Sequence, residues 1–351
     1  MENGTIFALH EHTNKKVSVI VPLYNMDTLI SKCIKSLIDQ TYSNIQIVII
    51  DDGSTDKSGK LADEYKDNDS RITVIHHPQN LGIANGIDTG IRNSIGDYIL
   101  FLDSDNYIAP DMIEILMRIM NDCDCDVVQC GAYCFTDESD SIIDRFTDTD
   151  EIFKSAIILE KEEIIKDFLN ENNITNNLSA KLFKRKLFNV IDIPLGRQIV
   201  DVIILPQILR NCEKYVCIKT QLYYAYMPPN SVSRGSISNR RISDLIYENE
   251  FYSLFIKNSW PEYYDYIPYR LTKSCLWAYD RLLVDRNNNE EFDIKKNSDY
   301  FFNKIKVNYP LLKTSRFFKL IVYRDRQKLF ILRHCRLLYD WIVKRKVINE
   351  S

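Results

Sequence analysis

Four aspartates stand in two closely spaced pairs, and each pair follows a short apolar run. Asp51 and Asp52 follow one run, and Asp103 and Asp105 follow another. Like charges at this spacing repel each other, so a cation or a hydrogen-bonded ligand must offset them, or at least one carboxyl group must have a raised pKa or face solvent. Mg²⁺ and Mn²⁺ bind carboxylate oxygens and complete their coordination with water and phosphate. The two pairs therefore predict a site for a divalent ion together with a diphosphate.

Each pair taken alone has a simpler interpretation. The Asp-Gly-Ser at residues 52–54 is also common turn chemistry, and Asp56 is placed to favour the positive end of a following helix. The argument for a site therefore depends on both pairs lying at one edge of one sheet, which requires the apolar runs before them to be strands of that sheet.

The apolar runs have the composition of buried strands. They are rich in β-branched residues and recur along the first hundred residues at Val17–Val21, Ile45–Ile50, Ile72–Ile75 and Tyr98–Leu102. Continuous apolarity is typical of strands covered on both faces of a parallel sheet. Between the first two runs, apolar residues from Leu29 to Ile38 recur at helical spacing. The pattern predicts a doubly wound α/β fold with a mostly parallel sheet, in which ligands bind at the carboxyl ends of the strands.

Local signals place further elements. Ser54 or Thr55 is a candidate N-cap for the second helix, and Pro110 suits the start of a helix over Asp111–Met120. Four cysteines at positions 123, 125, 130 and 134 do not have the spacing of structural zinc ligands, and Asp126–Phe135 is better interpreted as a strand. His76 and His77 are interpreted as a loop pair after the third strand.

Composition limits the class of protein. The 351 residues are 45% hydrophobic and 27% charged, which excludes a disordered chain and leaves room for two domains. The formal net charge of −4 argues against a dedicated nucleic-acid-binding protein. Because no apolar run reaches about 18 residues and the N-terminus lacks a secretory pattern, we expect a cytoplasmic protein. The nine cysteines, an odd number, suit a reducing compartment.

The C-terminal segment 313–346 has a strongly basic local composition. It holds eleven lysines and arginines against two aspartates, interleaved with aromatic and aliphatic residues. This pattern predicts amphipathic helices that bind an anionic membrane surface. The alternative is a helical subdomain with solvated charges. We favour the membrane, which would place the protein peripherally on the inner face of the cell membrane.

Three ordered segments resemble the signature segments of family-two glycosyltransferases of the GT-A fold. They are Val-Ser-Val-Ile-Val-Pro-Leu-Tyr-Asn at 17–25, Ile-Ile-Asp-Asp-Gly-Ser-Thr-Asp at 49–56 and Gly-Asp-Tyr-Ile-Leu-Phe-Leu-Asp-Ser-Asp-Asn at 96–106. The resemblance implies a nucleotide-activated sugar donor, usually a UDP-sugar, with Mn²⁺ or Mg²⁺ and inversion at the anomeric carbon. We expect a catalytic domain at 16–235, after a loose extension at 1–15 and before a helical region at 236–351.

Site roles follow from the resemblance by position. It implies that Tyr24 stacks on the nucleobase beside Pro22, and that Asp52 accepts a hydrogen bond from the uracil imide. Asp103 would bind the ribose or donor sugar and contribute to the metal site, where Asp105 is the principal ligand. These roles agree with the chemistry, because an aromatic face is a stacking platform and a carboxylate accepts from an imide N–H.

The resemblance also implies a general base, which we assign to Asp201. The stretch Lys181-Leu182-Phe183-Lys184-Arg185 before it looks like the Lys-Leu-Phe/Tyr-Lys/Arg stretch of the family. Two positions depart from the family pattern. Val200 stands where a glutamate normally precedes the base, and Ile87-Asp88 stand where many members have Arg-Asn. The departures indicate either an altered donor preference or lost activity.

Arg234 is a candidate ligand of the diphosphate, and a solvated loop arginine is the alternative. We predict a metal-dependent, inverting hexosyl- or N-acetylhexosaminyltransferase that transfers a sugar to a glycan acceptor, lipid-linked, in surface polysaccharide synthesis. A non-catalytic nucleotide-sugar-binding subunit is an alternative, as Val200 and Ile87 indicate. A metal-dependent nucleotidyltransferase shares the acidic edge, but no glycine-rich, lysine-containing loop follows the first strand.

Overall fold

A computed structural model describes residues 15–136, 152, 154–227, 237–284 and 293–350. The chain divides into two compact units, Met1–Pro229 and Asn230–Ser351. The expected extension at 1–15 lies outside the described residues except for Lys15.

The first unit is built on the four strands that the sequence predicts. They are β1 (Val17–Leu23), β2 (Ile45–Asp51), β3 (Ile72–His76) and β4 (Tyr98–Phe101). All neighbouring pairs among them are parallel, in the order β3-β2-β1-β4. Their carboxyl ends therefore share one edge, and Leu23 of β1 pairs in register with Asp51 of β2. This shared edge brings together the residues that follow each strand.

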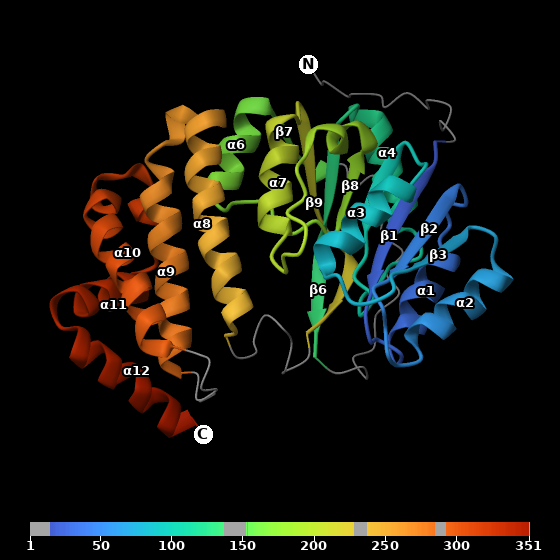
Figure 1. The fold of residues 1–351 in the computed structure, drawn as a ribbon. Coiled ribbons are helices and arrows are strands. Elements are labelled where there is room, and N and C mark those ends of the chain that lie inside the picture. The colour runs from blue at the N-terminus through green and yellow to red at the C-terminus, as the bar shows by residue number, and fades with distance from the viewer. Residues whose placement is uncertain (1–14, 137–151, 153, 228–236, 285–292, 351) are drawn as a thin grey trace, which may run out of the picture. The chain divides into compact units, whose positions relative to one another are not determined.

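Helices cover both faces of these strands, which makes the sheet doubly wound (Figure 1). The helices are α1 (Ile30–Ile38), α2 (Ser58–Asn68), α3 (Ile83–Asn93) and α4 (Met112–Cys123). Val19 and Val21 of β1 belong to the same core as Cys33 and Leu37 of α1. Ile20 points to the opposite face, where a side chain at Gly90 of α3 would contact it. Alternate β1 residues thus pack on different layers, as continuous apolarity predicts.

The start of α2 differs from the prediction. The helix begins at Ser58 rather than directly after Ser54 or Thr55. Both residues instead bind the loop after β1: Asn25 N donates to Ser54 Oγ at 3.1 Å, and Thr55 N donates to Asn25 Oδ1 at 2.8 Å. Asp56 accepts from Ser58 N at 2.9 Å and so caps the helix. The capping role moved because a distant loop competes for the earlier hydroxyl groups.

The sheet continues beyond β4 with five further strands, and parallel ladders still hold most of its paired residues. The order is β3-β2-β1-β4-β8-β6-β9-β5, and β7 pairs with β9. The added strands are β5 (Tyr107–Ile108), β6 (Val127–Phe135), β7 (Ile157–Glu160), β8 (Lys181–Lys184) and β9 (Lys214–Tyr226). The α/β fold and the strand predicted at Asp126–Phe135 are confirmed. Further helical elements among the described residues of the unit are α6 (Lys161–Leu169), η1 (Arg185–Val190) and α7 (Asp201–Arg210).

The second unit is helical in its described part, which confirms the predicted C-terminal helical region. Its elements are α8 (Asn239–Ser259), η2 (Pro261–Tyr263), α9 (Tyr266–Val284), α10 (Ile294–Thr314), η3 (Arg316–Leu320), α11 (Tyr323–His334) and α12 (Arg336–Glu350). Aromatic rings form much of its core: Tyr266 and Tyr269 of α9 both pack against Phe317, with centroids 5.1 and 6.3 Å apart. Among the described residues, no helix has the length and apolarity to cross a bilayer.

Several cations of the basic segment are used inside this unit. Lys328 pairs with Asp280 at 2.6 Å, Arg336 pairs with Asp299 at 2.5 Å, and Arg316 pairs with Asp265 at 2.9 Å. The local excess of positive charge available to a partner is therefore smaller than the sequence count indicates. Lysines and arginines at 319, 324, 333, 344 and 345 remain exposed.

Candidate active site

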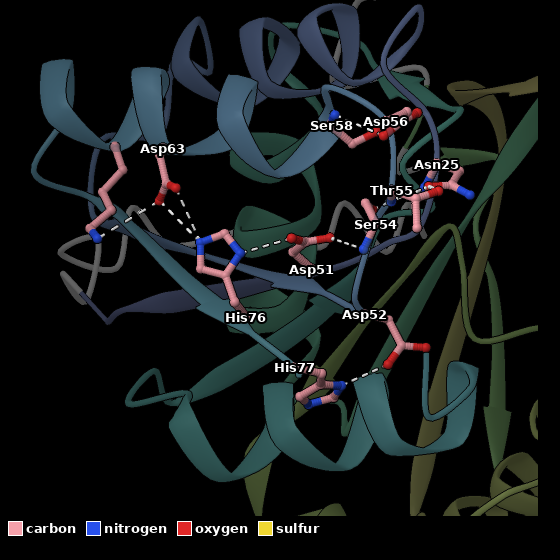
Figure 2. Close-up of polar contacts among 11 residues, drawn as sticks. Asn25, Asp51, Asp52, Ser54, Thr55, Asp56, Ser58, Asp63, His76 and His77 are labelled. Atoms are coloured by element: carbon pink, nitrogen blue, oxygen red, sulfur yellow. Dashed lines mark hydrogen bonds and ion pairs between the residues drawn. The ribbon is translucent and has the colours of Figure 1, made fainter. Parts of the chain in front are cut away.

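The first acidic pair is compensated by histidines from the neighbouring strand (Figure 2). Asp51 is buried and accepts from His76 Nδ1 at 2.8 Å and from Ser54 N at 3.0 Å. His76 Nε2 lies 3.2 Å from Asp63 of α2. The hydrogen bond to Asp51 raises the pKa of His76, and Asp63 adds to this effect while burial opposes it. A positively charged imidazole is therefore favoured between two carboxylates.

The second member of this pair, Asp52, is held still more firmly. Its Oδ1 accepts from His77 Nδ1 at 2.7 Å and from Leu81 N at 2.9 Å, while Oδ2 accepts from Gly82 N at 2.7 Å. His77 Nε2 lies 3.0 Å from Thr89 Oγ1 of α3. Each carboxylate oxygen can accept about two hydrogen bonds. By this count Oδ2 of Asp52, a residue that is 5% exposed, can accept one further hydrogen bond.

The interpretation of His76 and His77 as a loop pair is wrong for His76 alone, since His77 does follow β3. His76 is the last residue of β3 and lies in register opposite Asp51 of β2. Both histidines neutralise or orient carboxylates. The sequence had predicted that these carboxylates either repel each other or bind a cation. The signal was available, because parallel neighbouring strands put the residue after one apolar run opposite the residue after the next.

Tyr24 and Pro22 stand at the end of β1. Tyr24 is 41% exposed, so its ring is accessible to a ligand. Asn25 after it has φ of 52°, a left-handed conformation that its contacts with Ser54 and Thr55 maintain. A side chain at Gly86 of α3 would lie 3.5 Å from Pro22 Cβ, so the helix approaches the base of this loop.

The second acidic pair has a different environment. Oδ2 of Asp103 accepts from Tyr223 OH at 3.0 Å, Ser179 Oγ at 2.9 Å and Asn106 Nδ2 at 3.2 Å. Asp103 itself is exposed, while Asp105 is half-buried. Burial raises the pKa of Asp105 to about 6, and the charge of Asp103 adds to the shift. The repulsion between carboxylates that the sequence predicts is therefore found between Asp103 and Asp105.

Asp201 joins the second pair from a distant part of the chain. It is the first residue of α7, and Leu178 N–H donates a hydrogen bond to it. Burial raises the pKa of Asp201 to about 7; the charge of Asp103 contributes to the rise, and Lys181 opposes it. A carboxyl group with a pKa near the working pH has the acid–base property that proton transfer requires.

The two departures from the family pattern are both buried. Ile87 is 3% exposed within α3, and Val200, also 3% exposed, precedes α7. Asp88 pairs with Arg92 on the helix surface at 2.8 Å. Arg234 lies outside the described residues.

Three residues that hydrogen-bond to Asp103 were given no role by sequence reasoning. They are Asn106, Ser179 and Tyr223. Ser179 and Tyr223 are 76 and 120 positions from Asp103, so no local pattern links them to it. Only the pairing of β8 and β9 into the sheet brings Ser179 and Tyr223 near Asp103. Lys181 belongs to the stretch that resembles the family, but the sequence assigned it no role.

The second pair can offer a cation two carboxylates and no more. Within the described ranges, no group of three or more histidine, cysteine, aspartate or glutamate side chains could hold a metal ion. Two carboxylates, one exposed and one with a raised pKa, match the needs of Mg²⁺ or Mn²⁺, which keep water and phosphate ligands. They do not match a dedicated all-protein metal cage.

Comparisons with known proteins agree with this fold. The sequence model of glycosyl transferase family 2 matches residues 18–191. GlyG, a glycosyltransferase of Streptococcus pneumoniae, is 32% identical over 238 residues, covering 66% of this chain and 77% of GlyG. GlyA of the same organism is 31% identical over 228 residues, covering 62% of this chain but only 32% of GlyA. The chain thus spans about a third of the length of GlyA.

Solved structures share the architecture at low identity. The crystal structure of TarS residues 1–349 from S. aureus, in complex with UDP-GlcNAc, has a TM-score of 0.67 at 17% identity, covering 96% of this chain and 92% of that one. The fold is therefore of the GT-A type. This chain belongs to glycosyl transferase family 2.

Proposed function

We propose that this protein is an inverting glycosyltransferase that moves a sugar from a UDP-sugar to a hydroxyl group of a glycan acceptor. The observation that carries the proposal is the convergence of Asp103, Asp105 and Asp201, in which the charge of Asp103 raises the pKa of both other carboxyl groups. The solved complex of TarS with UDP-GlcNAc supports a nucleotide-sugar donor.

Donor recognition would use the ends of β1 and β2. The exposed ring of Tyr24 provides a stacking face for the nucleobase, beside Pro22. The remaining acceptor position on Asp52 Oδ2 suits the uracil imide N–H. Because His77, Leu81 and Gly82 already hold Asp52, its carboxylate needs little reorganisation on binding.

Asp103 and Asp105 would hold Mn²⁺ or Mg²⁺. A divalent cation would supply Lewis-acid stabilisation of the leaving diphosphate. Tyr223, Ser179 and Asn106 all donate hydrogen bonds to Oδ2 of Asp103. These bonds fix the orientation of the carboxylate. Asp105 would bind in its ionised form, because a nearby positive charge lowers the pKa that burial has raised.

Asp201 would act as general base. It would remove the proton from the acceptor hydroxyl as that oxygen attacks the anomeric carbon on the face opposite the diphosphate. One displacement inverts the configuration. The hydrogen bond from Leu178 N–H orients the carboxylate and favours its charged form.

The acceptor would be a lipid-linked glycan of a surface polysaccharide, reached at the inner face of the cell membrane. Support comes from α11 and α12, which expose the large apolar residues Tyr323, Phe330, Leu337, Leu338 and Trp341 beside exposed cations. Apolar side chains next to basic ones are the chemistry that an anionic lipid surface binds.

A panel of UDP-sugars tests the proposal. We expect slow, Mn²⁺-dependent release of UDP from one donor, and faster release when a glycan acceptor is added. The alternative of a non-catalytic nucleotide-sugar-binding subunit is favoured by one observation, the buried Val200 in place of a glutamate. That alternative predicts UDP-sugar binding by calorimetry without release from any donor.

A further inference from the structure

A fully buried lysine begins β8. Lys181 is 0% exposed, and its Nζ lies 2.7 Å from Thr175 Oγ1, 2.7 Å from the carbonyl oxygen of Asn177 and 2.9 Å from Asn177 Oδ1. A fourth acceptor, the carbonyl oxygen of Ser179, lies at 3.4 Å. The three short contacts match the three protons of an ammonium group. Buried lysines are rare unless they are paired, and among the described residues the hydrogen bonds of Lys181 Nζ go to the segment that precedes it.

That segment, residues 175–180, is called the anchor loop here, and it contacts both carboxylates of the second acidic group. Ser179 Oγ donates to Asp103 Oδ2 at 2.9 Å, and Leu178 N–H donates to Asp201. Ala180 has φ of 60°, a left-handed conformation that alanine rarely adopts. The surrounding contacts must therefore maintain the backbone of the loop, and Lys181 supplies three short ones.

The charged and titratable groups that influence Lys181 come from three elements: Asp201 of α7, Cys130 of β6 and Cys217 of β9. Burial raises the pKa of both thiols to about 12, so they are uncharged near neutral pH. Burial lowers the pKa of Lys181 to about 7, and the charge of Asp201 opposes this shift. The electrostatic partner of Lys181 among these groups is therefore Asp201.

We propose that Lys181 is a positioning residue of the active site, whose ammonium group holds the anchor loop against Asp103 and Asp201 and acts electrostatically on Asp201. The inference rests on the proposed function, because it assigns Lys181 to the same reaction. Among the described residues, the hydrogen bonds of Lys181 Nζ go to Thr175, Asn177 and Ser179, so Lys181 acts on the two carboxylates through Ser179, Leu178 and its charge.

The test compares Lys181→Met, Lys181→Arg and Thr175→Val by UDP release from a UDP-sugar with Mn²⁺ between pH 5 and 9. Methionine removes the charge, so we expect the acidic limb of the kcat profile to move up by about one pH unit, as loss of a neighbouring opposite charge predicts. Arginine should restore the position of the limb at least partly. Thr175→Val loosens the loop but keeps the charge, so kcat should fall with the limb unmoved.

A purely structural lysine predicts a different result. Stability would fall in Lys181→Met while the acidic limb of the kcat profile stayed at the wild-type pH. Alternatively, Lys181→Met and Lys181→Arg would move the acidic limb equally. Either result overturns the proposal. If Lys181→Met does not fold, the double variant Thr175→Val with Asn177→Ala replaces it. Wild-type kcat in that variant would overturn the anchoring role.

A second readout does not depend on turnover. The carboxyl carbon of Asp201 can be titrated by NMR, with its signal assigned by its absence in Asp201→Asn. We expect its pKa to be higher by about one unit in Lys181→Met than in the wild type. If the wild-type protein releases UDP from no donor, the proposed function fails, and this titration alone decides the electrostatic part: an unchanged pKa overturns it.

Discussion

The two acidic pairs resemble each other in sequence but differ in what surrounds each carboxylate. Asp51 and Asp52 receive imidazole and backbone N–H donors, which satisfy their charge without any ligand. Asp105 receives little such compensation, and burial together with Asp103 raises its pKa to about 6. The first pair is thus preorganised, and the second is where a cation has most to stabilise.

The role proposed for Asp201 predicts a specific kinetic change. Asp201→Asn keeps the size of the side chain and can still accept from Leu178 N–H, so donor binding measured by calorimetry should stay within about twofold. Turnover should fall at least about a hundredfold, the lower limit for a lost general base. A wild-type turnover rate in this variant would remove Asp201 from the mechanism.

The same residue predicts a pH dependence of stability. In the folded protein the pKa of Asp201 is raised to about 7 from its ordinary 3.8. Its contribution to stability is therefore fully present below about pH 4 and is lost as the pH rises through 7. Above pH 7 the wild-type protein buries a charge that Asp201→Asn does not have.

We therefore expect Asp201→Asn to be more stable than the wild type at pH 8, by an amount on the order of 2 kcal/mol, and nearly equal to it at pH 4. Urea unfolding with a chelator present measures both values. The comparison at pH 4 is the internal control, because the folded protein keeps the Asp201 proton there and buries no charge at this position. Equal stabilities of the wild type and Asp201→Asn at pH 8 would show that the pKa of the Asp201 carboxyl group is not raised.

Among the elements, α3 contributes most to the preorganisation of the donor site. Its first turn follows the N–H groups of Leu81 and Gly82, and its Thr89 contacts His77. The helix approaches the sheet closely at Gly90, where an added Cβ would lie 2.3 Å from Ile20 Cγ2. The distance between α3 and the strands is therefore set by the absence of a side chain at this position.

Two alanine substitutions in α3 test this approach. Gly90→Ala should destabilise the protein by about 1–3 kcal/mol, because the core must move to accept the methyl group. Gly86→Ala is the matched control, since its Cβ would lie an ordinary 3.5 Å from Pro22 and alanine favours a helix. Thermal unfolding of both variants measures the difference. Equal effects would mean that α3 is not closely packed at Gly90.

At the scale of the whole molecule, the chain joins a GT-A unit to a helical unit, and the two have different surfaces. The GT-A unit carries the acidic rim. In the helical unit, Lys328 and Arg336 are engaged internally, while α11 and α12 still expose apolar and basic residues together, including Leu337, which is 83% exposed. The proposed membrane contact depends on this combination rather than on total charge.

Vesicle binding tests that surface. We expect the full chain to co-sediment with vesicles containing phosphatidylglycerol at about 0.1 M salt, and much less at about 1 M, where the screening length falls from about 10 to about 3 Å. The double variant Leu337→Ser with Trp341→Ser should bind at least about tenfold more weakly. The control, Val307→Ser with Leu311→Ser on α10, changes equally exposed residues outside α11 and α12. Equal binding by both double variants would contradict the assignment.

The sequence alone determined the first four strands of the sheet, the strand at 126–135 and the residue types at the strand ends. Continuous β-branched runs specify buried parallel strands because both of their faces must be covered, and parallel strands bring their carboxyl ends to one edge. Tyr24, Asp52, Asp103 and Asp105 could therefore be named as site candidates from local patterns. The C-terminal helical region also followed from composition and periodicity.

Tertiary structure decided which partners complete the site. Ser179 and Tyr223 belong to segments that join the sheet far from Asp103 in sequence, and a hydrogen bond between such segments has no local signature. The pKa values of Asp105 and Asp201 depend on burial, which is a property of the packed fold. Residue types and spacing set the chemistry that is available, and long-range packing sets the charge and orientation of each group.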